Sequence, residues 1–365
     1  MIRPLELSTN FELYAYDPFR SYVCSRMNTP NVEALEEKLA RLENAQYCLA
    51  FNSGMAAITA LFLGVLKLGE RLIVSEDCYS ATYQFCAGFL KDWGVTTNFV
   101  DHRDMKNIKN AIKDNTKMIF IETPSNPMLH ICDLTETKKI IIKENFQRRL
   151  LPPILFAIDN TFATPLLQKP LEIGADFVIH STTKAINGHS TAVGGAIITK
   201  SQHWHEKLLR NRTIIGPIQQ PMNAWLTTIG LKTMEVRVTK QCETAMRLAE
   251  WLEKQPEIQY VLYPGLKSFP QKELATQQMK AGGTMISFAV KGNLETAKKF
   301  LKALEKISVA VSLGSVDSYI EIPYTMSHHD ISFGRIPDNL IRFSVGLENF
   351  EKLQEDLSRG LQAIK

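Results

Sequence analysis

Two stretches of the sequence indicate the fold most clearly: Ile154-Leu155-Phe156-Ala157-Ile158-Asp159 and Phe177-Val178-Ile179-His180-Ser181-Thr182-Thr183-Lys184. Each opens with a short run that is apolar on both faces, which is typical of a strand in a sheet covered on both sides. Lys184 follows Asp159 by 25 positions, enough for a strand–helix–strand unit. We therefore expect the acid and the lysine to project from the ends of neighbouring strands.

The same alternation extends through the first two thirds of the chain. Expected strands are residues 47–51, 71–74, 97–100, 118–121, 154–158, 177–179 and 196–198, and expected helices are 31–41, 56–66, 81–90 and 135–144. This pattern predicts an α/β fold with a mostly parallel sheet flanked by helices. Such sheets bind ligands at the carboxyl ends of their strands, where the loops gather.

The pattern changes after residues 217–221. One long helix is expected from about residue 223 to 254, followed by strand-like 285–290, a helix at 295–305, strand-like 341–345 and a closing helix from Asn349. We therefore predict two domains. Residues 1–222 form an N-terminal segment and a large domain, and residues 223–365 form the connecting helix and a smaller α/β domain.

Composition excludes several classes of protein. The 365 residues carry 42 basic and 38 acidic side chains, interspersed, with 45% hydrophobic residues. This balance fits a globular protein and does not call for nucleic acid. The charged run at 136–149 is interpreted as a solvated helix face, with docking of an acidic partner as the alternative.

The cysteines and the apolar segments indicate the compartment. Six cysteines are present without a CxxC pair or zinc-ligand spacing, so we expect free thiols, a reducing compartment and no metal site. No window approaches 18 uninterrupted apolar residues, and the N-terminus does not resemble a signal peptide. The expectation is a cytoplasmic protein that does not span a membrane.

Lys184 is the first candidate for chemistry. A lysine at the carboxyl edge of a buried sheet is costly unless it is paired or covalently engaged, and an imine to an aldehyde cofactor is one such engagement. Ser181 and Thr183 can hydrogen-bond a phosphate. An ordinary Ser/Thr-rich turn with a solvated lysine explains the same residues.

A second candidate is Asn52-Ser53-Gly54-Met55-Ala56-Ala57, a turn between an apolar strand and an Ala-rich helix. The backbone N–H groups and the positive helix end at such a turn suit a phosphate. Many helices that bind no ligand begin in the same way.

Three further residues have both a functional and a structural interpretation. Asp159 can keep a pyridine nitrogen protonated, or act as a helix cap or turn residue. Tyr79 can stack on a flat cofactor, or belong to the core. Arg342 interrupts an apolar run and can bind the carboxylate of an amino-acid substrate, although a structural salt bridge explains it equally well.

The order of these features resembles that of the fold-type I pyridoxal-phosphate enzymes. More closely, the chain resembles the cystathionine γ-synthase/γ-lyase family from about residue 4 to 363. The matching stretches are residues 21–30, 52–57, 122–127, 159–165, 180–190, 230–233, 263–266, 312–314 and 341–348.

The resemblance implies a role for each matching residue. Lys184 would bind pyridoxal 5'-phosphate as a Schiff base and later move protons. Gly54, Met55, Ser181 and Thr183 would hold the phosphate, Asp159 would face the ring nitrogen, Asn126 the ring hydroxyl, and Tyr79 would stack on the ring. Ser312 and Arg342 would hold the substrate carboxylate, and Arg26 would reach the neighbouring subunit's site in a homodimer or homotetramer.

The resemblance also implies the reaction. We expect γ-elimination or γ-replacement on a sulfur amino acid or an acylated homoserine, two reactions that share one set of residues. The alternatives are a β-lyase of the same family, an aminotransferase-like activity, or a degenerate cofactor-binding protein without efficient turnover.

The chain departs from the family pattern at several positions. Cys24 replaces a tyrosine that helps bind the partner's phosphate, Thr191 replaces an acid, and Ala185 replaces an aromatic residue. Most of the N-terminal arm that clasps a neighbouring subunit is absent from the sequence, so we expect a looser tetramer.

Three other departures bear on substrate specificity. Enzymes of this family that take cystathionine commonly carry a Glu where this chain has Val311, and an Arg where it has Gln84. The cysteine typical of methionine γ-lyases is Ala81 here. A pocket without extra charges favours a substrate with an uncharged tail, because an unpaired charge is expensive in a closed site.

Overall fold

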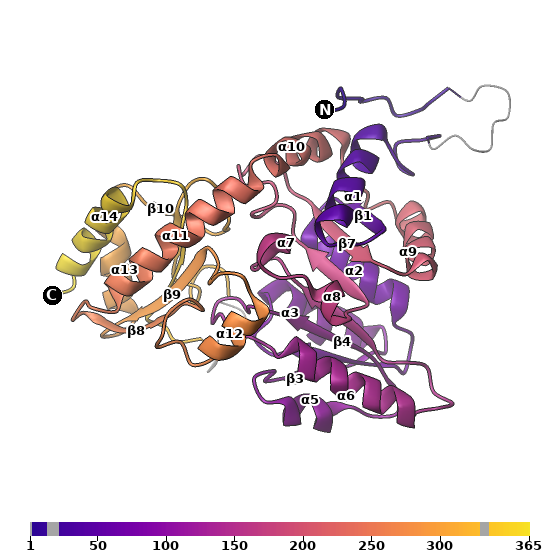
Figure 1. The fold of residues 1–365 in the computed structure, drawn as a ribbon, viewed down its shortest axis with the longest axis horizontal. Helices are drawn as coiled ribbons and strands as arrows, with labels where there is room; N and C mark the ends of the chain where they lie inside the picture. Colours follow the sequence, from indigo (N-terminus) through magenta and orange to yellow (C-terminus); the bar gives the residue numbers. More distant parts are fainter. Residues whose placement is uncertain (1, 13–21, 329–335) are drawn as a thin grey trace.

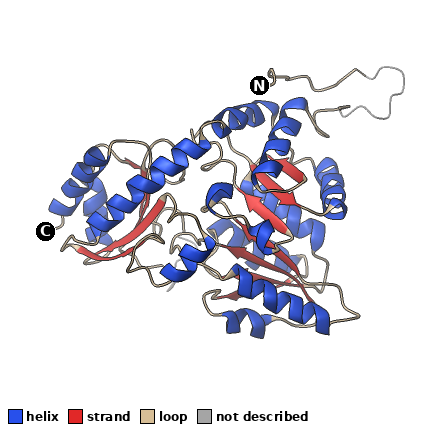
Figure 2. Ribbon diagram, viewed as in Figure 1, coloured by secondary structure: helices blue, strands red, loops and turns tan. Residues whose placement is uncertain are grey.

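The computed structural model describes residues 2–12, 22–328 and 336–365. These residues form two sheets that are flanked by helices. The helices α10 and α11 run from one sheet to the other (Figure 1). Figure 2 shows the larger sheet beside the N-terminal half of the molecule and the smaller sheet beside the C-terminus. No helix in the described ranges is long and apolar enough to cross a membrane.

The large sheet has seven strands in the order β1-β7-β6-β5-β4-β2-β3. The strands are β1 Tyr47–Phe51, β2 Arg71–Ser75, β3 Thr96–Val100, β4 Thr116–Glu122, β5 Leu155–Asp159, β6 Phe177–His180 and β7 Gly195–Thr199. The strands from β2 to β6 are parallel, and β7 is antiparallel to both of its neighbours. All seven predicted strands are confirmed.

Helices cover both faces of this sheet because alternate residues of each strand are buried on opposite sides. One layer contains α1 Pro30–Leu42, α5 Met105–Ala111 and α6 Leu134–Gln147. The other contains α2 Gly54–Val65, α3 Ser80–Ala87, α4 Phe89–Asp92 and α9 Gln202–Ile215. The short helices α7 Thr164–Leu167 and α8 Pro170–Ile173 connect β5 to β6, which confirms the predicted strand–helix–strand unit.

The expected long connecting helix is two helices, α10 Pro221–Leu231 and α11 Met234–Leu252. The break lies where the chain meets the loop after Lys184. A Cβ on Gly230 would lie 2.1 Å from the carbonyl oxygen of Asn187. The buried guanidinium of Arg237 donates to the carbonyl oxygens of Gly230 and Ala185 at 2.9 and 3.0 Å. Arg237 thus connects the end of α10 to the loop that carries Lys184.

The smaller sheet has five strands in the order β10-β11-β12-β9-β8. They are β8 Ile258–Leu262, β9 Met285–Val290, β10 Ser308–Val309, β11 Tyr319–Glu321 and β12 Leu340–Ser344, with the helices α12 Lys272–Gln278, α13 Leu294–Lys302 and α14 Phe350–Gln362. The predicted strands at 285–290 and 341–345 correspond to β9 and β12. The predicted helix at 81–90 is interrupted at Gly88, between α3 and α4.

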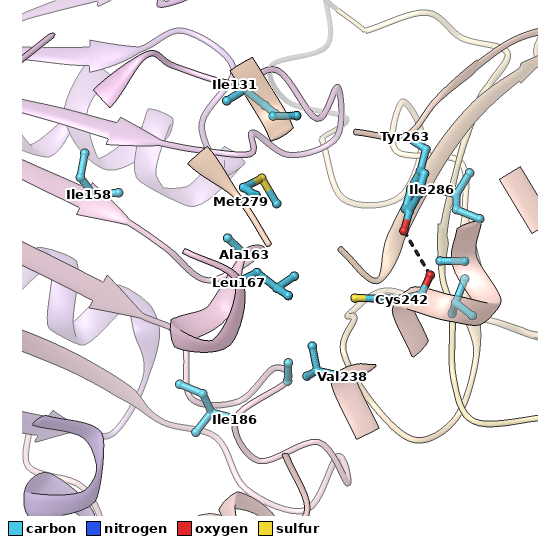
Figure 3. Packing of buried hydrophobic residues seen from close by; sticks show 14 of the residues in the cluster. Ile131, Ile158, Ala163, Leu167, Ile186, Val238, Cys242, Tyr263, Met279 and Ile286 are labelled. Atoms are coloured by element: carbon cyan, nitrogen blue, oxygen red, sulfur yellow. Dashed lines mark hydrogen bonds between the residues drawn. The ribbon is translucent and has the colours of Figure 1, made fainter. Parts of the chain in front are cut away.

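One hydrophobic cluster joins the two sheets. Ala163 and Leu167 from the β5–β6 connection, Met279 after α12 and Val238 of α11 belong to this cluster and face a common space (Figure 3). On the small-sheet side, the Tyr263 hydroxyl donates to the carbonyl oxygen of Cys242 at 3.3 Å. This shared core fixes the loops of one sheet against those of the other.

Candidate active site

A pocket of about 270 Å³ lies at the carboxyl ends of the parallel strands, where the two sheets meet. Every site residue predicted from the sequence lines it except Arg26. These residues are Gly54, Met55, Tyr79, Asn126, Asp159, Ser181, Thr183, Lys184, Val311, Ser312 and Arg342. Residues without an assigned sequence role also line it, notably Glu122, Thr161 and Ser327.

One end of the pocket is the N-terminus of α2. Ser53 caps this helix by accepting a hydrogen bond from the Ala56 N–H at 3.0 Å. A Cβ on Gly54 would lie 2.9 Å from the Cβ of Ser181, so only glycine allows the helix to approach the lysine loop this closely. The first N–H groups of the helix and the hydroxyl of Ser181 therefore border one small space, which suits an anion.

Lys184 occupies the centre of the pocket. Its Nζ donates to the Ser312 Oγ at 3.0 Å. Burial and the nearby Arg342 charge lower the pKa of Lys184 from 10.5 to about 8, while Glu321 opposes the shift. This amine is therefore much closer to a neutral nucleophile or base at physiological pH than a solvated lysine is. The solvated-turn interpretation of this residue does not hold.

Asp159 is the last residue of β5 and lies at the floor of the pocket. Its Oδ1 accepts from the N–H of Thr161 at 3.0 Å and from the Thr161 hydroxyl at 2.6 Å. The same hydroxyl oxygen accepts from the N–H of Ser181 at 2.9 Å. Burial raises the pKa of Asp159 despite these bonds, so a cationic group facing it would stabilise its ionised form.

Glu122 lines the pocket but was not among the site residues predicted from the sequence. Its Oε2 accepts from the Tyr79 N–H at 2.8 Å, and its Oε1 accepts from the Asn126 N–H at 2.9 Å. It ends β4 directly opposite Asp159. Burial and the Asp159 charge raise its pKa well above the usual value. One carboxyl group thus joins the loops that carry the predicted ring-stacking and ring-hydroxyl residues.

Arg342 forms the structural salt bridge that its sequence allowed, and it also faces the pocket. It lines the pocket, and its Nη2 forms an ion pair with the Glu321 Oε1 at 2.8 Å. Its Nη1 donates to the Asn126 Oδ1 at 2.7 Å, and its Nη2 also donates to the Ser312 carbonyl oxygen at 3.1 Å.

Several residues named from the sequence lie outside this pocket, among them Arg26 and Gln84. Arg26 donates from Nη1 to the carbonyl oxygen of Thr213 and does not line the pocket of its own chain. Gln84 lies on α3 and is also not among the lining residues. Within the described ranges, no group of three or more His, Cys, Asp or Glu side chains could hold a metal ion.

The family is decided by comparison with known proteins. The model of the Cys/Met metabolism PLP-dependent enzyme family matches residues 1–362. The chain belongs to this family. Like its other members, this Cys/Met metabolism enzyme uses pyridoxal 5'-phosphate and has the α/β fold of the fold-type I enzymes.

Similar proteins cover nearly the whole of this family member. The L-methionine gamma-lyase of Treponema denticola is 37% identical, over 94% of this chain and 86% of its own. The cystathionine beta-lyase of Coxiella burnetii is 38% identical, over 99% and 93%. The crystal structure of metB from Corynebacterium glutamicum is 42% identical, with a TM-score of 0.95 over 100% of this chain and 93% of that one.

The residues of the pocket fit the family's cofactor. The end formed by Gly54 and Ser181 suits the phosphate, and the buried Asp159 carboxyl suits a protonated ring nitrogen. The amine of Lys184 lies in the same pocket, with the low pKa that imine formation requires.

Proposed function

We propose that the protein catalyses γ-elimination or γ-replacement on an amino acid with an uncharged tail, either a sulfur amino acid or an acylated homoserine. The observation that carries the proposal is the single pocket in which Lys184, Asp159 and Arg342 lie beside the apolar Val311. The relatives named methionine gamma-lyase support the substrate class.

Each residue contributes a defined action in this proposal. When bound, pyridoxal phosphate withdraws electrons from the substrate's Cα, which makes loss of a proton there accessible. Asp159 would stabilise the positive charge on the ring nitrogen, and Tyr79 would contact the ring. Arg342 and Ser312 bind the α-carboxylate and so orient the Cα–H bond toward Lys184. The neutral Nζ of Lys184 then takes the α-proton and returns a proton later.

The apolar side of the pocket supports the preference for an uncharged tail. Val311, Ile58, Phe162 and Leu313 line it. The charged side chains that also line it have partners within the site or a role toward the cofactor. A second charge at the distal end of a substrate would meet no partner among these four side chains, and a charge that loses water without gaining a partner is costly.

A substrate panel with the purified holoenzyme tests this proposal. Methionine, homocysteine, cystathionine, cysteine and O-acylated homoserines are incubated with and without an added thiol, and Lys184→Ala is the control. An α-keto acid with ammonia indicates elimination, and a new thioether or thiol product indicates replacement. Turnover of methionine or acylated homoserine supports the proposal, whereas no turnover of any substrate would overturn it.

The second candidate is a β-lyase, because the cystathionine beta-lyase of Coxiella burnetii is similar over nearly its full length. The panel separates the two. Pyruvate and homocysteine from cystathionine, without any reaction of methionine, would favour β-elimination.

We also propose a homodimer or homotetramer, in which Arg26 reaches the site of the neighbouring subunit. Exposed apolar side chains occur before β7, at Val193, and from the end of α9 to the start of α11, at Ile214, Ile215, Met222, Ile229 and Val236. Arg26 is bonded to Thr213, next to two of them. Light scattering after size exclusion would contradict the proposal if the holoenzyme were a monomer. A cytoplasmic location is proposed on the six free thiols.

A further inference from the structure

Arg342 shares the pocket with a second buried charge, Glu321. The two residues are opposite each other in the antiparallel pair β11–β12. The Arg342 Nη2 lies 2.8 Å from the Glu321 Oε1, and the side chains are only 3% and 1% exposed. In the function proposed above, Arg342 also binds the substrate's α-carboxylate. The guanidinium of Arg342 then binds two carboxylates, that of Glu321 and that of the substrate.

The remaining contacts fix the plane of the guanidinium. Nη1 donates to Asn126 and Nη2 also donates to the Ser312 carbonyl oxygen, so the loop after β4 and the segment from Ser312 to Glu321 together surround it. Glu321 has a second partner, because the Ser327 hydroxyl donates to the same Oε1 at 2.6 Å. Ser327 itself lines the pocket. The orientation of Arg342 therefore depends on Glu321 as much as on the substrate-facing loops.

The second oxygen of Glu321 is unusual. Its Oε2 is buried and has no hydrogen-bond partner among the described residues. A buried carboxylate oxygen without a hydrogen-bond donor lowers the stability of the folded protein. A residue that carries this cost is expected to have a role other than stabilising the core. The pair is thus not explained by stability alone, since a well-packed apolar pair of residues would serve the core equally well.

We propose that Glu321 is a positioning residue that aims Arg342 at the substrate's α-carboxylate and offsets part of its charge. This inference rests on the function proposed above. The charged and titratable groups that face Arg342 are Glu321 on β11, Glu122 on β4, Tyr79 after β2, Lys184 after β6 and His328 after β11. Of these, only Glu321 forms an ion pair with it. The bound substrate carboxylate and Glu321 consequently compete for one cation.

The two parts of this role are separable by substitution. Glu321→Gln keeps an acceptor oxygen for Nη2 and removes the competing charge. Glu321→Ala removes both, so Arg342 loses its orientation. Glu295→Gln is the matched control, because Glu295 lies exposed on α13, where it forms an ion pair with Lys298.

The test measures binding to the full-length holoenzyme through the change in cofactor absorption. Norleucine has an uncharged tail and no γ leaving group, and n-pentylamine is the same molecule without the carboxylate. With Glu321→Gln we expect the Kd of norleucine to fall about tenfold, and with Glu321→Ala to rise about tenfold. The Kd of n-pentylamine stays unchanged in both, and Glu295→Gln changes neither.

Two results would overturn the inference. The first is unchanged norleucine binding by both variants. The second is an equal change for norleucine and n-pentylamine, since a merely structural role moves both ligands together. If Glu321→Ala does not fold, Glu321→Gln alone decides, because it is nearly isosteric. Failure of the proposed function has a different signature, namely no turnover in the substrate panel while the norleucine response of the variants persists.

Discussion

The Nζ of Lys184 lies 3.0 Å from the Oγ of Ser312, a residue 128 positions further along the chain. The lysine follows β6 of the large sheet, and the serine follows β10 of the small sheet. Ser312 has a φ of 93°, a conformation that a residue other than glycine adopts only at a cost. The pocket is therefore completed by both sheets, at a point where the backbone is strained to deliver a hydroxyl group to the lysine.

Lys184→Ala should abolish the visible absorption of the bound cofactor. Without the amine no covalent bond to the cofactor forms, and only the phosphate and ring contacts remain. Absorption spectra of the dialysed wild type and variant check this. Lys169→Ala, which changes a lysine outside the pocket, should keep the band. A band unchanged in Lys184→Ala would show that another residue binds the cofactor.

The rate of turnover should depend on the pKa of Lys184. The amine accepts the α-proton only when it is neutral, and burial together with Arg342 lowers its pKa from 10.5 to about 8. A lowered pKa moves the required deprotonation to lower pH, so kcat should rise with pH and level off above about 8. The pH profile of kcat measures this value in the substrate complex. A rise that continues to the pH of an ordinary lysine would contradict the assignment.

Val311→Glu should shift selectivity toward cystathionine. The new carboxylate can pair with the distal ammonium group of cystathionine, whereas methionine would leave it unpaired in the pocket. We expect the ratio of kcat/KM for cystathionine over methionine to rise at least about tenfold. Val311→Gln, which has a similar size and no charge, is the control. An equal change in both variants would mean that size, rather than charge, determines selectivity.

Glu122→Gln should loosen the cofactor site. The amide keeps one acceptor oxygen but places an NH2 group against one of the two backbone N–H donors, from Tyr79 or Asn126. Loss of one buried hydrogen bond with an unsatisfied donor costs about 1–3 kcal/mol. Cofactor titration and thermal unfolding should both show the loss. Glu295→Gln, a substitution at an exposed position, should change neither cofactor affinity nor thermal stability. If Glu122→Gln also changed neither quantity, the loops that carry Tyr79 and Asn126 would not depend on this carboxyl group.

Cys24→Tyr should tighten cofactor binding, because a phenol can hydrogen-bond a phosphate that a thiol binds poorly. Cys24 does not line the pocket of its own chain, so the gain requires an assembled oligomer. Cofactor affinity measured by dialysis equilibrium, with Cys24→Ser as the control, checks this. Equal affinity of all three proteins would place the residue away from the neighbouring site.

The sequence predicted the large sheet and most of the pocket because those signals are local. Each strand is an apolar run, and residues such as Asp159 and Lys184 follow directly after one. Parallel strands end at the same edge, so their final residues meet without further information.

Other features depend on pairing between distant strands, which a sequence read alone does not reveal. Glu321 ends a strand of three residues, and only the register with β12 places it against Arg342. Glu122 was part of a matching motif, but its role lies in two backbone N–H groups that no side-chain pattern marks. The break between α10 and α11 was missed because neither Lys232 nor Thr233 is a strong helix breaker. Its cause is the close approach of Gly230 to a loop some 43 positions earlier, at Asn187.

The bonds of Arg237 restrict how the molecule can move. This side chain from the start of α11 holds both the end of α10 and the loop that carries Lys184. A swing of the small sheet about the α10–α11 junction would break these bonds in the interior and displace the lysine itself. Substrate admission therefore has to proceed by motion of surface segments at the mouth of the pocket, such as the one bearing the exposed Val311, while the catalytic base stays fixed in a rigid frame.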